Sequence, residues 1–359
     1  MIKFWEANRD YFAHKQEIDE AIQRVLSKGE LVLGFSPDIT EFETKFAEFI
    51  GTQHAIMTGS GTHALYLSYR ALGIGQGDEV IVPSMTFAAT IDQIVALGAI
   101  PVTVDIGEDG LIDPIEVEKA ITKRTKAIVP VHLEGKNCNM ERINEIATNH
   151  GLIVIEDSAQ AIGSKLDSNN TKCFSLFPAK ILGSVGNAGM ITTNDDQLSD
   201  KLRMLRCNYN LGKNPDTENA EWGMNMEPDN IQAAVLNVKF KYLRENLERR
   251  AEIARRYDEA FKDLPITLAV KQNGRVYQDY VLRIPENKAE FVKYLQDNGV
   301  GILGYNLIPH HHYKKLNLPF LPKTDLYIKQ QIRIPINQNI TDEEVEEVIR
   351  VIRSFYDKK

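Results

Sequence analysis

Short apolar runs alternate with stretches of helical periodicity through the first two thirds of the chain. Apolar residues recur every three or four positions over 15–28 and 42–50, which predicts two helices. The runs that resemble strands are 79–83, 100–105, 127–131, 153–156 and 190–193. The first four are separated by roughly 20–25 residues of helical character, which is βαβ spacing and predicts a mostly parallel sheet. Their lack of polar alternation is typical of strands buried on both faces.

The pattern changes towards the C-terminus. One long amphipathic helix is predicted over 231–261. It is followed by predicted strands at 267–270 and 280–284 and by predicted helices at 288–298 and 342–356. Thr341 is a good N-cap for the last helix, since Glu344 stands three residues on. We therefore predict an α/β protein with a large domain at 1–245 and a smaller α+β domain at 246–359.

Composition narrows the class of protein. The 359 residues are 43% hydrophobic and 26% charged, as in ordinary soluble globular proteins. The net charge of -8 argues against a nucleic-acid surface. No apolar run reaches the length of about 18 residues that a membrane span needs, and the N-terminus has no export signal. Cys138, Cys173 and Cys207 are odd in number and lack CxxC spacing, so a reducing cytoplasm is expected.

One lysine stands in apolar, turn-forming surroundings. Lys180 lies within 174–183, close to Phe177, Pro178 and Ile181. Partial desolvation lowers the pKa of a lysine amine and makes it a nucleophile towards carbonyls, so Lys180 is a candidate for Schiff-base chemistry. Most lysines are solvated surface charges, so this interpretation depends on suitable partners elsewhere in the chain.

A glycine-rich turn precedes a predicted helix at 64–72. The turn contains Gly59, Ser60, Gly61 and Thr62, so backbone N–H groups, hydroxyls and the helix dipole converge on one point and favour an anion. The spacing matches neither the Walker pattern nor GxGxxG, which disfavours nucleoside triphosphates and dinucleotides. A plain glycine turn capped by Ser60 or Thr62 is the alternative.

Polar residues follow the predicted strand at 153–156. Asp157 stands at its carboxyl end, where α/β sheets gather ligands, and an aspartate there can hold a protonated ring nitrogen. Gln160 can reach the same side and donate a hydrogen bond to a ring oxygen. Asp157 as a helix N-cap and Gln160 as a solvated side chain are the alternatives.

Two further residues complete a cofactor site. Ser175 lies five residues before Lys180, so its hydroxyl can face the same anion as the glycine turn. Phe87 follows another strand end and can lie flat on an aromatic ring, although most phenylalanines belong to a core. A reactive lysine, an aspartate for a pyridinium nitrogen, a phosphate cradle and an aromatic cover together indicate pyridoxal 5′-phosphate, a cofactor that acts as an electron sink.

The chain resembles the DegT/DnrJ/EryC1/StrS sugar aminotransferases, which have the fold-type I architecture of aspartate aminotransferase. The similar motifs run along nearly the whole chain and lie at Val32-Leu33-Gly34, 41–51, 59–65, 72–87, 130–133, 156–161 and 175–183. The resemblance implies that Lys180 binds the cofactor covalently, that Asp157 pairs with its pyridine nitrogen, that Gln160 contacts its ring hydroxyl and that Phe87 stacks on the ring.

The resemblance also implies the phosphate contacts and the oligomer. Gly61, Thr62, His63 (through its backbone) and Ser175 are similar to the family's phosphate-binding residues. Asn225 resembles an asparagine that the family sends across a dimer interface to the neighbour's cofactor phosphate, which implies a homodimer with shared active sites.

Some positions depart from the family pattern. Glu227 stands where an arginine is frequent, Ile181 where an asparagine is frequent, and 131–136 differs from the usual continuation. His310 and His311 lie in the region near the family's substrate entrance and are candidate substrate contacts. With His312 they could also form a metal tract, but neighbouring side chains diverge in most backbones, so no metal site is predicted.

The resulting hypothesis is an aminotransferase that moves an amino group from glutamate to a keto sugar. The sugar is expected to be a 3- or 4-keto-deoxysugar linked to a nucleotide, made for a surface polysaccharide such as lipopolysaccharide O-antigen or for a secondary metabolite. Three alternatives stay open: a sugar dehydratase of the same family, in which a histidine replaces the lysine; a cofactor-binding sensor or regulator; and a dinucleotide-dependent sugar oxidoreductase, which the glycine turn disfavours.

Overall fold

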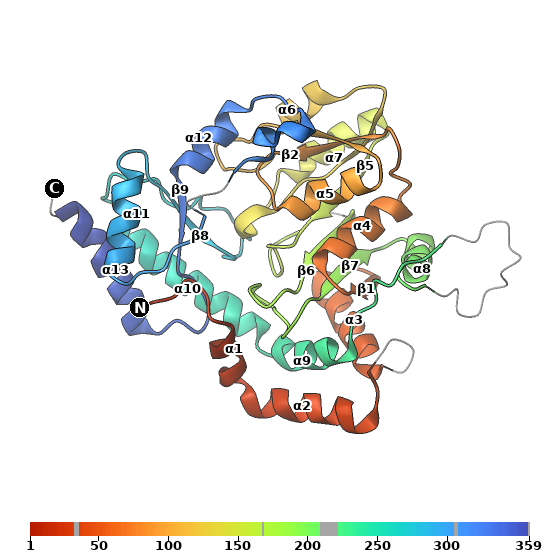
Figure 1. The fold of residues 1–359 in the computed structure, drawn as a ribbon, viewed down its shortest axis with the longest axis horizontal. Coiled ribbons are helices and arrows are strands. Elements are labelled where there is room, and N and C mark those ends of the chain that lie inside the picture. Colours follow the sequence, from red (N-terminus) through yellow and green to blue (C-terminus); the bar gives the residue numbers. More distant parts are fainter. Residues whose placement is uncertain (32–35, 167–168, 209–221, 305–307, 358–359) are drawn as a thin grey trace, which may run out of the picture.

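The computed structural model describes residues 1–31, 36–166, 169–208, 222–304 and 308–357 (Figure 1). The motif Val32-Leu33-Gly34 lies outside the described residues. The strands are β1 (His54–Thr58), β2 (Glu79–Pro83), β3 (Ile100–Val104), β4 (Thr125–Ile128), β5 (Ile153–Asp157), β6 (Thr171–Ser175), β7 (Gly189–Thr193), β8 (Tyr280–Arg283) and β9 (Gln331–Ile334).

The helices of the described residues are α1 (Ala7–Ala13), α2 (Lys15–Lys28), α3 (Pro37–Ile50), α4 (Gly61–Ala71), α5 (Ala88–Ala96), α6 (Pro114–Ala120), α7 (Met140–His150), α8 (Asp196–Leu205), α9 (Asn230–Phe240), α10 (Leu243–Phe261), α11 (Lys288–Asp297), α12 (Pro322–Gln330) and α13 (Asp342–Asp357). Short 3-10 turns are η1 (Leu133–Gly135), η2 (His310–His312) and η3 (Lys314–Leu316).

A seven-stranded sheet is the centre of the described structure, with the strand order β1-β7-β6-β5-β4-β2-β3. Strands β2 to β6 run parallel to one another, whereas β7 is antiparallel to both of its neighbours, β1 and β6. The predicted mostly parallel sheet is confirmed. The antiparallel β7 directly follows the segment that carries Lys180, so the chain leaves that segment in the reverse direction.

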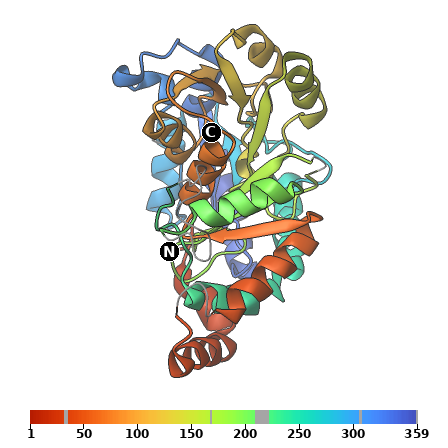
Figure 2. The same cartoon turned by 90° about the vertical axis from the view of Figure 1, so that its right-hand side faces the viewer.

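Helices cover both faces of this sheet (Figures 1 and 2). Val80 and Val82 of β2 pack with α4, α5 and α8, whereas Ile81 between them packs with α6 and α7 on the opposite face. Near the β1 and β7 edge, α3 and α9 pack on the second face as well. Both faces of the strands are therefore apolar, which explains why their sequences show no polar alternation.

A second apolar cluster gathers α10, α11, α13 and the antiparallel pair β8 and β9. Ile2 packs into this cluster and bridges to Val300, so both marked ends of the chain lie on this side (Figure 1). Thr341 and Glu344 exchange hydrogen bonds of 3.0 and 3.2 Å, which confirms the predicted cap of α13. The predicted domain boundary at 245/246 stays a prediction, and it falls in the first turn of α10.

Two predicted elements are wrong. The single helix over 231–261 is divided between α9 and α10, because Lys241 and Tyr242 at the junction bond the carboxylate of Glu17 in α2. The break lets α9 pack under the sheet while α10 crosses to the second cluster. The predicted strand at 267–270 is only an isolated bridge between Thr267 and Arg283, since the next residues pack into the second cluster instead of pairing.

Within the described residues, none of the helices combines the length and the apolar character that crossing a membrane requires.

Candidate active site

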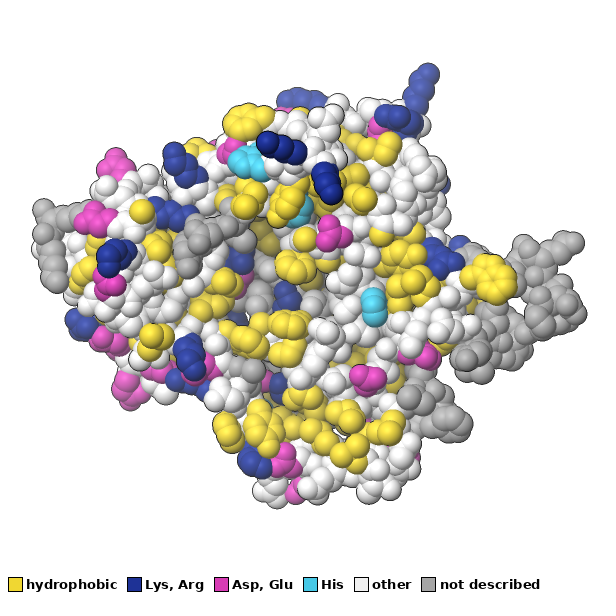
Figure 3. Space-filling view, viewed as in Figure 1, with side chains coloured by type: hydrophobic (Ala, Val, Ile, Leu, Met, Phe, Trp, Pro, Cys, Tyr) yellow, Lys and Arg dark blue, Asp and Glu magenta, His cyan; other side chains and the backbone are white. Residues whose placement is uncertain are grey.

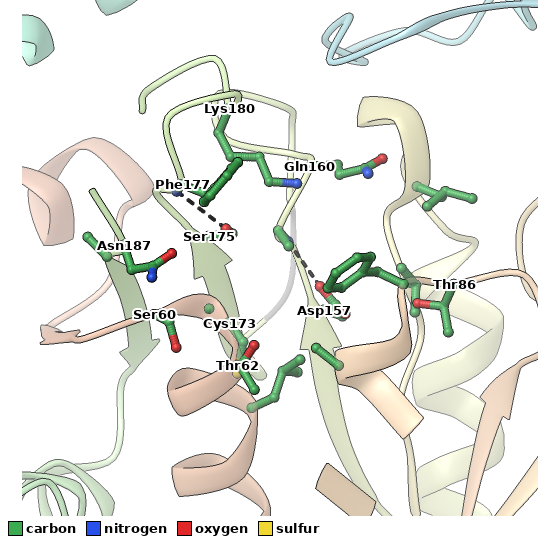
Figure 4. Close-up of a pocket in the computed structure, with 18 residues that line it drawn as sticks. Ser60, Thr62, Thr86, Asp157, Gln160, Cys173, Ser175, Phe177, Lys180 and Asn187 are labelled. Atoms are coloured by element: carbon green, nitrogen blue, oxygen red, sulfur yellow. Dashed lines mark hydrogen bonds between the residues drawn. The ribbon is translucent and has the colours of Figure 1, made fainter. Parts of the chain in front are cut away.

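A cavity of about 380 Å³ opens at the carboxyl ends of β2 and β5 and at the N-terminus of α4. Figure 4 shows the amine of Lys180 pointing towards Gln160, with Ser60, Ser175 and Asn187 on one side of the cavity and Asp157 and Thr86 on the other. The lining residues are Ser60, Gly61, Thr62, Leu65, Thr86, Phe87, Ala89, Val131, Leu133, Asp157, Ala159, Gln160, Cys173, Ser175, Phe177, Lys180, Asn187 and Ala188.

Lys180 stands on a tight turn between β6 and β7 and lines the cavity. Its backbone N–H donates to the carbonyl of Phe177 at 2.8 Å. Gly183 closes the turn, because a Cβ there would lie 2.5 Å from the carbonyl oxygen of Pro178. Burial lowers the pKa of the Lys180 amine, although the carboxylates of Asp279 and Asp157 oppose that shift. The amine is therefore more easily deprotonated than that of a solvated lysine.

Asp157 ends β5 and is buried at the base of the cavity. Its Oδ2 accepts a hydrogen bond of 2.7 Å from the hydroxyl of Thr90, and its Oδ1 accepts one of 3.1 Å from the N–H of Ala159. Burial raises the pKa of Asp157, while these two hydrogen bonds act in the opposite direction. A buried carboxylate beside a cavity is suited to a cationic partner, which offsets the cost of its burial.

Gln160 lines the cavity opposite Lys180 (Figure 4). Its Oε1 accepts a hydrogen bond of 2.7 Å from the backbone N–H of Glu134. Because only the oxygen of the amide can accept that bond, the Nε2 donor is left for the cavity. The expected hydrogen bond from Gln160 to a ligand stays a prediction.

The glycine turn and Ser175 meet at one end of the cavity. Gly61 begins α4, so the N–H groups of Gly61 and Thr62 belong to a helical first turn, where such groups have no partner inside the helix. A Cβ on Gly61 would lie 2.9 Å from the Cβ of Ser175, so glycine is what lets the turn approach β6 this closely. Ser60 caps the helix and accepts the N–H of His63 at 3.0 Å.

Of the predicted site residues Phe87, His63 and Asn225, only Phe87 lines the cavity. Phe87 lines the cavity with a largely exposed ring, so it does not belong to the core. His63 is not among the lining residues, and its backbone N–H already serves the cap of α4. Asn225 is exposed and lies outside the cavity of its own chain.

His310 and His311 are buried and do not line the cavity. Both bond Ser84 just after β2: His310 Nδ1 lies 2.9 Å from the carbonyl oxygen, and His311 Nδ1 lies 2.9 Å from the hydroxyl. The structure therefore does not bring His310 and His311 together with the other predicted residues. This holds although Ser84, which they contact, lies only three positions before Phe87.

Several site residues escaped the sequence analysis. Asn187 lines the cavity two residues before β7, and the glycines on both sides of it were the available signal. Thr90 holds Asp157 from the first turn of α5, and Thr86 lies 2.7 Å from the Thr90 hydroxyl. Glu134 adopts a left-handed backbone with φ of 61°, which no sequence pattern of a glutamate predicts.

Comparison with known proteins decides the family. The family model described as the DegT/DnrJ/EryC1/StrS aminotransferase family matches residues 13–353. The chain belongs to this family. The fold and the aminotransferase class predicted from the sequence are thereby confirmed, and the enzyme uses pyridoxal 5′-phosphate as the family does.

Individual relatives are similar to this chain over nearly its full length. The dTDP-3-amino-3,6-dideoxy-alpha-D-galactopyranose transaminase of Aneurinibacillus thermoaerophilus is 38% identical, with 99% of each chain covered. The structure of DesV from S. venezuelae, in complex with a ketimine intermediate, is 35% identical at a TM-score of 0.92 and covers 99% of this chain and 98% of its own. The structure of NtdA from Bacillus subtilis, with the bound cofactor PMP, is 30% identical at a TM-score of 0.91, with 98% of this chain and 85% of its own covered.

The residues present in this aminotransferase fit the cofactor. The cavity has an apolar body, a buried carboxylate at its base and a helix N-terminus with a serine at one end. These are the groups that a flat pyridinium ring with a phosphate requires. The amine of Lys180 faces the same space (Figure 4).

Proposed function

We propose that this enzyme transfers an amino group from glutamate to a keto sugar linked to a nucleoside diphosphate. The observation that carries the proposal is the Lys180 amine, with a lowered pKa, in one cavity with Asp157 and Gln160. The name of the relative from Aneurinibacillus thermoaerophilus, a dTDP-amino-sugar transaminase, supports the sugar class. We propose a 3- or 4-keto-deoxysugar, made for a surface polysaccharide such as an O-antigen or for a secondary metabolite.

Pyridoxal 5′-phosphate, when bound, supplies an electron sink for the carbon that gains or loses the amino group. In this proposal Asp157 keeps a proton on the ring nitrogen, because its buried carboxylate is stabilised by a cation beside it. Gln160 donates from Nε2 to the ring oxygen, since its Oε1 is engaged by Glu134. Phe87 covers the ring, and the largely exposed position of its side chain leaves it free to do so.

Lys180 takes two roles in the proposal. It holds the cofactor through its amine, and after the amino donor has bound it accepts and returns a proton at Nζ. Its lowered pKa suits the second role, because the neutral amine is the form that accepts a proton. The N–H groups of Gly61 and Thr62 with the Ser175 hydroxyl bind the phosphate, which fixes the ring relative to Nζ.

We also propose a homodimer in which Asn225 of one chain completes the site of the other. Asn225 is exposed, and the carbonyl of the next residue, Met226, accepts the N–H of Gly59 at 2.9 Å, so the segment lies beside the glycine turn. Hydrophobic side chains gather over the lower part of the face in Figure 3, where α2 and α9 lie in Figure 1. A second copy of the chain would cover such a surface. The cytoplasmic location stays a prediction.

The test is a reaction of the holoenzyme with L-glutamate and a panel of dTDP- and UDP-linked 3-keto and 4-keto sugars. Mass spectrometry should detect the amino sugar, with one 2-oxoglutarate formed for each amine transferred. Lys180→Ala should abolish the product, and Lys180→Arg, which keeps the charge, should abolish it as well. Loss of water without transfer of nitrogen would instead favour the dehydratase, and no turnover on any sugar would favour the sensor or regulator.

A further inference from the structure

Three side chains of the kinds that bind metals converge where η2 meets α12. His311 Nε2 lies 3.2 Å and His312 Nε2 lies 2.7 Å from the same oxygen, Oδ1 of Asp325. The three ligand atoms all lie within 4.8 Å of one another. Ligands on a tetrahedral zinc ion, at about 2.0–2.1 Å from the metal, are about 3.3 Å apart, so these spacings are close to those of a metal site.

The adjacent histidines were expected to diverge, and that expectation is wrong here. The 3-10 turn of η2 sets the two rings edge to face, with centroids 4.6 Å apart and an angle of 89° between their planes. Both Nε2 atoms then point at the first turn of α12, where Asp325 lies. The local backbone therefore brings together two imidazoles that adjacency in sequence would usually separate.

His311 is the member that a simple ion pair does not explain. Its side chain is 1% exposed, and within the described residues its Nε2 has no hydrogen-bond partner, because the Asp325 oxygen lies outside hydrogen-bond geometry. Its other ring nitrogen, Nδ1, is 2.9 Å from the hydroxyl of Ser84, which also accepts the His311 backbone N–H at 3.1 Å. One nitrogen held by a polar group while the other stays free is the arrangement of a metal-bound histidine.

The cluster is open on one side. The side chain of His312 is 46% exposed and that of Asp325 is 25% exposed, so an ion can enter from solvent and water can complete its coordination. Two imidazoles and one carboxylate suit a borderline divalent cation better than Mg²⁺ or Ca²⁺, which prefer oxygen ligands.

We propose that His311, His312 and Asp325 bind one divalent transition-metal cation of the Zn²⁺ type, outside the cofactor cavity. The ion joins η2 to α12, and through Ser84 it holds both against the end of β2. Phe87 stands three residues after Ser84, so the ion also steadies the loop that carries the ring over the cofactor cavity.

The test uses tag-free holoenzyme that has been stripped with EDTA, loaded with ZnCl₂ and dialysed. Elemental analysis should find one zinc ion per chain, and loading with Co²⁺ should give the visible absorption of a low-coordinate site. Competition with a chromophoric chelator gives the affinity for zinc. Ser84→Ala, which removes the hydroxyl that bonds both the ring and the backbone N–H of His311, should weaken zinc binding by about 10–100-fold.

His312→Ala and Asp325→Asn should weaken zinc binding at least as strongly, and both positions are partly exposed, so circular dichroism should show an unchanged fold. His54→Ala is the matched control, because His54 Nε2 also lies 2.7 Å from an aspartate, Asp196, but with no second histidine in reach of that cluster among the described residues. Failure of the wild type to retain zinc would overturn the proposal. Equal zinc retention by His312→Ala, Asp325→Asn and His54→Ala would overturn it too.

Discussion

The backbone N–H of Glu134 donates a 2.7 Å hydrogen bond to the side-chain oxygen of Gln160. Glu134 makes this bond from a left-handed backbone conformation, with Gly135 following it at φ of 80°. The strained turn therefore engages the oxygen of the Gln160 amide and leaves its Nε2 outside this bond.

Gln160→Glu should lower kcat/KM by about 10–100-fold, the effect of losing a hydrogen bond worth about 1.5–3 kcal/mol. The new carboxylate can still accept the Glu134 N–H, but it presents an acceptor where Nε2 was a donor. Steady-state kinetics with the amino donor and a keto sugar measure the effect. Gln53→Glu adds the same charge at an exposed position and is the control; equal kcat/KM for the two variants would refute the donor role.

The reactivity of Lys180 should depend on pH in a way that Asp279 controls. A lowered pKa moves deprotonation to lower pH, so labelling of cofactor-free protein by an amine-reactive arylsulfonate should reach half its maximal rate below the usual lysine value of about 10.4. Asp279 opposes the lowering, so Asp279→Asn should move the midpoint to still lower pH. Peptide mass spectrometry locates the label on Lys180.

Asp263→Asn is the control for that titration, because Asp263 pairs with Arg353 on the exposed side of α13, away from the cavity. It should leave the Lys180 midpoint unchanged. A midpoint for Asp279→Asn at the wild-type value or above it would contradict the assigned electrostatics.

Gly61→Ala should weaken cofactor binding. The added Cβ would meet Ser175 Cβ at 2.9 Å and Ser175 Cα at 3.1 Å, so the turn must move away from β6. Such overpacking costs about 1–3 kcal/mol, which corresponds to an increase of roughly 5- to 160-fold in the dissociation constant measured by fluorescence titration. Gly75→Ala, where a Cβ meets nothing within 4 Å, should bind the cofactor as the wild type does.

Breaking the buried pair of Glu134 and Lys136 should destabilise the fold. Their charged atoms lie 2.9 Å apart, and both side chains are only 2% exposed. Glu134→Leu leaves Lys136 without its carboxylate and should cost about 3–5 kcal/mol in urea unfolding, whereas Glu134→Leu with Lys136→Met should cost less than that single variant. A double variant less stable than Glu134→Leu would contradict this account.

The same pair predicts an acid dependence. Although burial raises it, the pKa of Glu134 is lowered overall by Lys136, Arg333 and Arg275. A depressed folded-state pKa gives stability that is present above the unfolded value of about 4.3 and is lost as pH falls through the folded value. The unfolding free energy of the wild type should therefore fall more steeply below about pH 4 than that of the double variant.

Shared active sites predict complementation between two inactive variants. In a mixed dimer of Lys180→Ala and Asn225→Ala chains, one site would combine the intact Lys180 of one chain with the intact Asn225 of the other. Mixing the two variants under conditions of subunit exchange should restore part of the activity. No recovery, with exchange demonstrated by native mass spectrometry, would show that Asn225 serves its own chain or none.

The elements of the fold that the sequence predicts correctly are those determined by residues close together in the chain. Apolar runs such as 79–83 become β2 because such strands need only be apolar on both faces, and the cap at Thr341 depends on residues three apart. The break between α9 and α10 could not be predicted, because Glu17, more than two hundred residues earlier, holds the junction.

The candidate site also contains some residues that could be predicted from the sequence and others that could not. Lys180, Asp157 and Gln160 stand at turn and strand ends that motifs reveal, and the structure places all three in one cavity. Glu134 was missed, because its role comes from a contact with Gln160, 26 residues away in sequence. Asn187 was missed although glycines lie on both sides of it. His310 and His311 were interpreted from the family resemblance, and the metal tract was disfavoured from adjacency alone. Neither argument could place Asp325 of α12 beside the rings of His311 and His312.

Gln278 bonds the backbone on both sides of Lys180. Its Oε1 accepts a hydrogen bond of 3.2 Å from the N–H of Ile181, and its Nε2 donates one of 3.1 Å to the carbonyl of Ala179. Its amide thus substitutes for the peptide group of a neighbouring strand. The walls of the cavity all come from residues 60–188, yet the turn that presents the reactive amine is held by Gln278, which lies 97 positions after Ile181. A fragment ending before Gln278 would contain every residue that lines the cavity, but it would lack the two hydrogen bonds that fix the backbone on both sides of Lys180.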